Sequence, residues 1–181
     1  MGFDSETAFE SALIKCLVEE KGWKDGVIKY PTEKDLLDNW AKIIFENNRD
    51  IDRLGDFPMT DGEMAQIMGQ IAKLRTPLNL NGFINGGTVQ IIRDNENDTH
   101  NFKKTISLKI FDRNEIAAGR TRYQIAQQPK FKAKNSIYPN RRGDFCLLIN
   151  GMPVIHVELK KSNVPVSEAQ YQICLLYTSP S

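Results

Sequence analysis

Apolar residues recur at three- and four-residue spacing along three stretches in the first half of the chain, the pattern of amphipathic helices. The first stretch follows Ser5, a suitable helix N-cap, and ends at Gly22. The second stretch begins near Thr32. The third follows Thr60, and Glu63 three positions later completes a capping-box pattern. The sequence therefore predicts a helical N-terminal part.

The second half of the chain changes to short runs of β-branched and other apolar residues separated by polar turns. Pro77 is expected to end the third helix. Strands are then predicted at 88–93, 106–111 and 121–126, and two more runs follow near residue 150. Helices followed by strands of this length predict an α/β protein with a central sheet.

The last two apolar runs form a predicted β-hairpin. Phe145–Ile149 and Val154–Leu159 flank Asn150–Gly151, a dipeptide that favours a tight turn because both positions tolerate positive φ. Asp144 precedes the first run, whereas Glu158–Lys160 ends the second. Antiparallel pairing brings these two ends together, and alternation along a strand places Glu158 and Lys160 on one face.

The residue types at this end of the hairpin fit metal-dependent hydrolysis. Carboxylate oxygens such as those of Asp144 and Glu158 suit Mg²⁺, and the Leu159 carbonyl can add a further ligand. Lys160 can orient a water molecule or stabilise developing negative charge. The alternative is a surface hairpin with a solvated Glu/Lys edge, because charged residues are common on edge strands.

Several motifs together resemble one family, the nuclease domain of the R subunit of type I restriction-modification systems, in the PD-(D/E)XK superfamily. The matching motifs are Arg142-Gly143-Asp144, Ile149–Pro153, Val157–Lys160, Ser5–Glu10 with Gly22-Trp23, and Arg122–Gln128. Gly143 stands where the family carries proline. Gln172 matches the first residue of a Gln-x-x-x-Tyr motif, but Leu176 occupies the tyrosine position and Tyr177 follows it.

The resemblance implies a restriction-endonuclease-like fold, a mixed central sheet flanked by helices, and Mg²⁺-dependent hydrolysis of double-stranded DNA. It implies catalytic roles for Asp144, Glu158, Lys160 and Gln172, and a metal-binding role for Glu10, with Glu6 as its rival. It also implies methyltransferase and specificity subunits as partners, and ATP use only through a motor domain that these residues do not encode.

The sequence leaves three alternatives open. The chain could be another PD-(D/E)XK nuclease, such as a repair or Holliday-junction enzyme. It could also be a non-catalytic DNA-binding or assembly domain that keeps the same fold, or an intracellular scaffold.

The charge of the whole chain is nearly balanced, but its distribution is uneven. Lys and Arg number 24 and Asp and Glu 23, yet residues 101–142 contain eleven basic and two acidic residues. Such a segment indicates a phosphate-contacting surface next to Asp144, or else a solvated basic loop.

Length and cysteine content bound the remaining possibilities. The 181 residues predict one nuclease domain over 1–173 and a tail over 174–181 that is truncated or non-native. Three widely spaced cysteines predict neither disulfides nor a zinc site. With no secretory signal or apolar span, a cytoplasmic location away from the membrane is expected.

Overall fold

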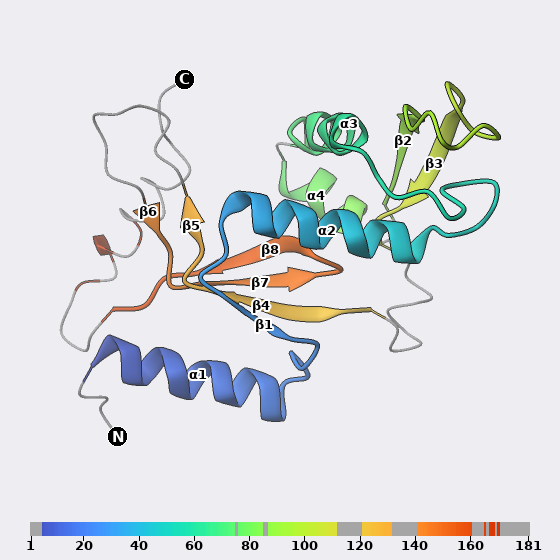
Figure 1. Cartoon of the computed structure of the whole chain (residues 1–181). Coiled ribbons are helices and arrows are strands. Elements are labelled where there is room, and N and C mark those ends of the chain that lie inside the picture. The colour runs from blue at the N-terminus through green and yellow to red at the C-terminus, as the bar shows by residue number, and fades with distance from the viewer. Residues whose placement is uncertain are drawn as a thin grey trace. The chain divides into compact units, whose positions relative to one another are not determined.

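Helices and strands both occur along the described chain, and its strands form one four-stranded mixed sheet and two two-stranded sheets (Figure 1). The elements of this computed structural model are α1 (Glu6–Glu20), β1 (Val27–Lys29), α2 (Glu33–Asn47), α3 (Asp61–Ile71), α4 (Pro77–Ile84), β2 (Thr88–Ile92), β3 (Thr105–Lys109), β4 (Tyr123–Gln127), β5 (Lys130–Phe131), β6 (Arg141–Arg142), β7 (Phe145–Ile149) and β8 (Met152–Val157). The structure describes residues 5–74, 76–84, 87–111, 121–131, 141–160, 165, 167–168 and 170.

The chain divides into two compact units. The sheet unit comprises residues 1–36 and 122–181, and the inserted unit comprises residues 37–121. The sequence treated 1–173 as one domain, and the predicted boundary before the 174–181 tail lies outside the described residues. Among the helices that the structure describes, none combines the length and apolar character needed to cross a membrane.

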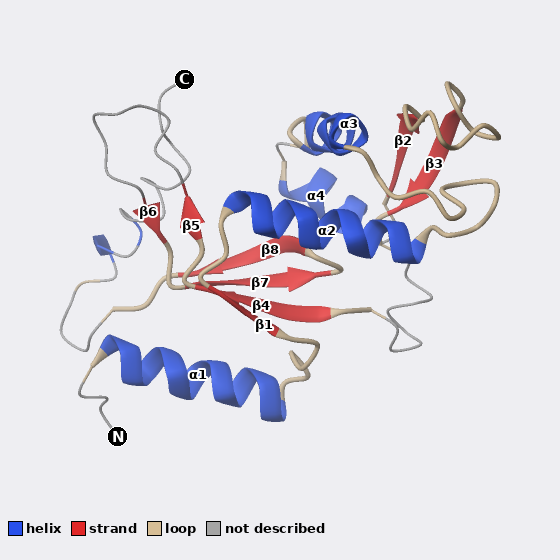
Figure 2. Cartoon of the chain, viewed as in Figure 1, coloured by secondary structure: helices blue, strands red, loops and turns tan. Residues whose placement is uncertain are grey.

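The sheet unit contains a four-stranded sheet in the order β1-β4-β7-β8 (Figure 2). β1 runs parallel to β4, whereas β4, β7 and β8 pair antiparallel with their neighbours. The predicted mixed sheet is therefore confirmed. The sequence did not predict β1, because three residues are too few to show an alternating pattern.

Both faces of β7 are buried, which explains why its sequence is an unbroken apolar run. On one face, Ile14 of α1 packs with three strand residues and with Leu159, which follows β8; the strand residues are Ile125, Phe145 and Leu147. On the other face, Leu36 packs with Ala126, Cys146 and Leu148. Figure 1 shows α1 lying along the first of these faces. Alternate residues of one strand thus bind α1 and the first turn of α2.

The hairpin turn has the predicted conformation. Asn150 and Gly151 both have positive φ, 50° and 83°, and Ile149 pairs with Met152 across a two-residue turn. The buried Asn150 side chain accepts a hydrogen bond from the Arg122 N–H at 2.9 Å. The second strand was predicted to run from 154 to 159, but it runs from Met152 to Val157. It starts earlier because the turn has only two residues, so that Met152 already pairs with Ile149.

The inserted unit confirms two further strand predictions and the capping box. β2 and β3 pair antiparallel, and the Thr60 side chain accepts the Glu63 N–H while Glu63 accepts the Thr60 N–H. The expectation that Pro77 ends the third helix was wrong: α3 ends at Ile71, and Pro77 instead opens α4, where its missing N–H has no cost.

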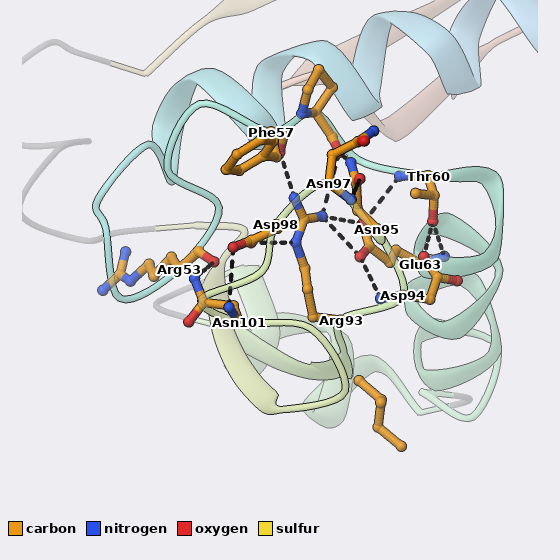
Figure 3. A network of polar contacts seen from close by, with 12 residues as sticks. Arg53, Phe57, Thr60, Glu63, Arg93, Asp94, Asn95, Asn97, Asp98 and Asn101 are labelled. Carbon is orange, nitrogen blue, oxygen red and sulfur yellow. Dashed lines mark hydrogen bonds and ion pairs between the residues drawn. The ribbon is translucent and has the colours of Figure 1, made fainter.

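A buried arginine joins three segments of the inserted unit. Arg93 is 0% exposed, and its guanidinium lies 2.6 Å from Glu63 Oε2 and 2.9 Å from Asp98 Oδ2 (Figure 3). It also donates to the Phe57 carbonyl at 2.7 Å. These contacts fix α3 and the turn after β2 to the segment that precedes Thr60.

Candidate active site

The hairpin brings the predicted acidic and basic residues together at the end opposite its turn. Phe145 pairs with Val157, so Asp144 and Glu158 extend beyond the same rung of the ladder. The Leu159 N–H donates to Asp144 Oδ2 at 2.5 Å, and Lys160 Nζ lies 3.5 Å from Glu158 Oε1. Leu159 itself points into the core, as expected from alternation. The result is a compact group of two carboxylates and one ammonium.

Burial dominates the electrostatics of this group. Burial raises the pKa of Asp144. The hydrogen bond from the Leu159 N–H lowers this pKa, whereas the negative charge of Glu10 raises it further. Burial also raises the pKa of Glu158, where the charge of Asp144 adds to the effect and Lys160 opposes it. The Glu158 side chain is only 7% exposed. Both carboxylates therefore gain from a nearby cation beyond the single charge of Lys160.

His156 of β8 lies two residues before Glu158 and borders the site. Its Nε2 lies 3.6 Å from Glu158 Oε2, and burial lowers its pKa while the charge of Asp144 opposes that shift. Gly143 leaves room for the ring, because a Cβ at this position would stand 2.8 Å from His156 Nε2. Gly143, which replaces the family's proline, therefore lacks the Cβ that would clash with the His156 ring.

Glu10 reaches the site from α1 through two glutamines that sequence reasoning did not assign. Its side chain is buried, and its Oε1 accepts from Gln127 Nε2 at 2.7 Å. Gln128 Nε2 donates to both carboxylate oxygens, at 3.3 and 3.1 Å. The available signal was the match of Arg122–Gln128 to a family motif, but nothing in the sequence linked it to α1.

Glu6, the rival of Glu10, lies near enough for its charge to raise the pKa of Asp144. Gln172, the remaining predicted site residue, and Tyr177 lie outside the described residues. All the predicted site residues that the structure describes therefore lie at one end of the sheet unit.

The sequence also matches a known protein family. Residues 4–181 match the family described as type I restriction enzyme R protein N terminus. The chain belongs to this family. The resemblance inferred from the hairpin motifs is thereby confirmed over nearly the whole chain.

Curated relatives carry the same assignment. The chain is 28% identical over 177 residues to the type I restriction enzyme SsaAORF53P endonuclease subunit of Staphylococcus saprophyticus. It is 27% identical over 175 residues to the SauCOLORF180P endonuclease subunit of Staphylococcus aureus strain COL. Each match covers 96% of this chain but 16% of the relative. The chain thus spans about a sixth of the length of these curated relatives.

The donor set of this R-protein N terminus fits a magnesium ion. Within the described part of the chain, no three Asp, Glu, His or Cys side chains form a metal-binding group. Mg²⁺ does not need such a group, because proteins commonly hold it through one or two carboxylates, water and substrate phosphate. Glu158 Oε2 is buried without a hydrogen-bond partner among the described residues, which leaves a ligand atom available beside Asp144.

Proposed function

We propose that this chain is a Mg²⁺-dependent endonuclease domain of a type I restriction enzyme and hydrolyses phosphodiester bonds of double-stranded DNA. The observation that carries the proposal is the Asp144–Leu159 hydrogen bond, which holds the Asp144 carboxylate beside the Glu158–Lys160 segment. The family match supports the same conclusion. In this proposal the enzyme is a type I site-specific deoxyribonuclease, and the isolated domain is a weak one.

The chemistry divides among the residues by type. Asp144 and Glu158 bind the cation, with the Leu159 carbonyl as a further ligand. The bound Mg²⁺ supplies Lewis acidity, which lowers the pKa of water and offsets phosphate charge. Lys160, whose side chain is 17% exposed, orients the attacking water and stabilises charge as it develops on the phosphate. Gln172 is proposed as an additional polar contact, from the family motif alone.

A basic ribbon next to Asp144 supports DNA as the partner. Lys130 of β5 and Arg142 of β6 pair directly across the strands, a like-charge arrangement that is unfavourable without an anion. Lys130 Nζ also lies 5.8 Å from the centre of the Tyr30 ring, which is 51% exposed. These side chains are suited to phosphate contacts that position a duplex without reading its sequence.

The complete protein is proposed to do more than these residues encode. Methyltransferase and specificity subunits would be its partners, and a motor domain elsewhere in the polypeptide would use ATP. The short fraction of the relatives that this chain covers is consistent with such further domains. Cys16 and Cys146 are free thiols, which suits the reducing cytoplasm that we propose as its location.

Two rival functions predict different behaviour. A non-catalytic DNA-binding or assembly domain would keep the fold but would not need Lys160 for activity. A repair or junction nuclease would cleave without methyltransferase and specificity partners, and the family match favours the restriction function over it.

The decisive experiment is Mg²⁺-dependent cleavage of DNA by the complete protein in its full complex. Asp144→Ala and Lys160→Ala should abolish cleavage while DNA binding, measured by mobility shift, is kept. Lys15→Ala is the control, because Lys15 is a lysine on α1 whose side chain is 71% exposed. Unchanged cleavage by both site variants would support the non-catalytic alternative.

A further inference from the structure

Gln128 contacts two acidic residues of the candidate site, Glu10 through its side chain and Asp144 through its backbone. Its amide donates to both oxygens of Glu10 on α1, and its N–H donates to the Asp144 carbonyl at 2.7 Å. We propose that Gln128 is a positioning residue: it holds Glu10 on the Asp144 side of the site, where Glu10 can accept a hydrogen bond from a water molecule on the cation that Asp144 and Glu158 bind. This inference rests on the proposed nuclease function.

The backbone of Gln128 is in a conformation that ordinary residues avoid. Its φ is 51°, in the left-handed region where glycine is the favoured residue. β4 has just ended at Gln127, so glycine at position 128 would make the same turn with less strain. A long amide side chain at such a position therefore needs another reason, and strained residues of this kind cluster at functional sites. The contact with Glu10 provides that reason.

The hydrogen bonds to Glu10 nearly exhaust its capacity as an acceptor. A carboxylate offers about four lone-pair positions. Gln127 and Gln128 occupy three of them, two on Oε1 and one on Oε2. Among the described residues no donor takes the remaining position on Oε2, which can accept a single bond from a water molecule on the cation. The two glutamines therefore restrict further hydrogen bonding by Glu10 to its Oε2 atom.

Without these donors, Glu10 would not stay where it is. It is a buried carboxylate that repels Asp144, as the upward effect of Glu10 on the pKa of Asp144 indicates. Buried carboxylates are stable only when they are hydrogen-bonded or paired. Removing the Gln128 amide leaves Gln127 as the one donor to Glu10 among the described residues, and lets the Glu10 side chain turn away from Asp144.

The test separates the amide from the backbone by comparing Gln128→Gly with Gln128→Ala in the full chain. Both variants lose the amide, but only alanine keeps the strain of a positive φ. We expect Mn²⁺ affinity, measured by calorimetry, to fall about 10- to 100-fold in both variants. The denaturant midpoint of the metal-free protein should fall less in Gln128→Gly than in Gln128→Ala. A purely structural residue would change the midpoint and leave the Mn²⁺ affinity unchanged.

A double variant shows whether Gln128 acts through Glu10. Glu10→Gln should weaken Mn²⁺ binding by a similar factor, and adding Gln128→Gly to it should produce less than about a twofold further loss. Wild-type Mn²⁺ affinity in Gln128→Gly would overturn the proposal, as would a full additional loss in the double variant.

Asp144→Ala distinguishes this failure from failure of the nuclease proposal. If Asp144→Ala loses Mn²⁺ binding and cleavage in the full complex but Gln128→Gly keeps both, only the positioning role is wrong. If Asp144→Ala keeps both, the proposed function is wrong and the positioning role falls with it.

Discussion

The carboxylate of Asp144 accepts a hydrogen bond from the main-chain N–H of Leu159, the residue between Glu158 and Lys160. This bond fixes the residue before β7 to the segment after β8, so that groups fourteen residues apart share one site. The N–H would bond equally well to an amide oxygen. The fold therefore needs an acceptor at position 144, whereas the proposed chemistry needs a negative charge there.

Asp144→Asn separates these two requirements. The amide oxygen can still accept the Leu159 N–H, while the buried charge whose pKa the site raises is gone. We expect the free energy of unfolding of the metal-free protein to be equal to or above that of the wild type. Cleavage by the full complex should fall by roughly 10²-fold or more. Denaturation and nicking assays measure the two effects.

Asp25→Asn is the matched control for this substitution. Asp25 also accepts a main-chain N–H, that of Tyr123 at 2.7 Å, but Tyr123 pairs with Ile149 at the turn end of the hairpin. Its replacement should leave cleavage unchanged. Equal losses of cleavage in both variants would mean that Asp144 has a structural role only.

The sequence was sufficient to predict features that depend on neighbouring residues. Phe145–Ile149 forms the predicted strand because its apolar run is buried on both faces, and Asn150–Gly151 forms the predicted turn because both residues accept positive φ. Asp144, Glu158 and Lys160 converge for the same local reason: antiparallel pairing joins the ends of one hairpin.

Features that depend on distant segments could not be predicted in this way. Glu10 contacts Gln127 and Gln128, which lie 117 and 118 residues further along the chain, only because α1 packs against β4. β1 pairs in parallel with β4, and parallel pairing leaves no local turn to identify it. The buried ion pairs of Arg93 likewise depend on packing between elements, because an arginine after a strand is ordinarily solvated.

The pH dependence of cation binding follows from the raised pKa values of Asp144 and Glu158. Because their folded-state pKa values lie above the unfolded ones, the metal-free fold loses stability as the pH rises through these values. A cation must displace the same protons, so Mn²⁺ affinity should rise with pH, by up to about tenfold per unit for each proton displaced. Calorimetry from about pH 4, near the free carboxyl pKa values, to about pH 8 measures this slope.

The control for this experiment is Glu158→Gln, which removes one of the two titrating groups. Its binding should be weaker and should depend less steeply on pH. Wild-type Mn²⁺ affinity that does not change with pH would contradict the assignment of these carboxylates as ligands.

Arg93→Ala should destabilise the inserted unit strongly. The substitution leaves Glu63 and Asp98 buried without their cation, which costs about 3–5 kcal/mol in comparable buried pairs. Hydrogen exchange of the β2 and β3 amides measures the free energy of opening in this unit. Arg49→Ala is the control, because Arg49 and its partner Asp56 are more than half exposed, and it should cost at most about 1 kcal/mol. Similar costs in the two variants would show that the Arg93 network is not closed to water.

Cys146 should resist thiol reagents in the folded protein. It is buried beneath Leu36, and burial raises its pKa to about 11, so roughly one molecule in 10³ carries the thiolate at pH 8. Cys16 on α1 is partly exposed and should react before Cys146. Mass spectrometry of peptides after maleimide labelling measures each cysteine, with denatured protein as the control. Labelling of Cys146 at the rate of Cys16 would contradict the position of β7 in the core.

The central claim is that Asp144 and Glu158 share a divalent cation. Anomalous diffraction from crystals of the full chain soaked in Mn²⁺ tests it most directly. We predict a peak within coordination distance of both carboxylates, about 2.0–2.6 Å, that disappears in Asp144→Ala crystals. Full Mn²⁺ occupancy elsewhere with none between these two residues would contradict the claim.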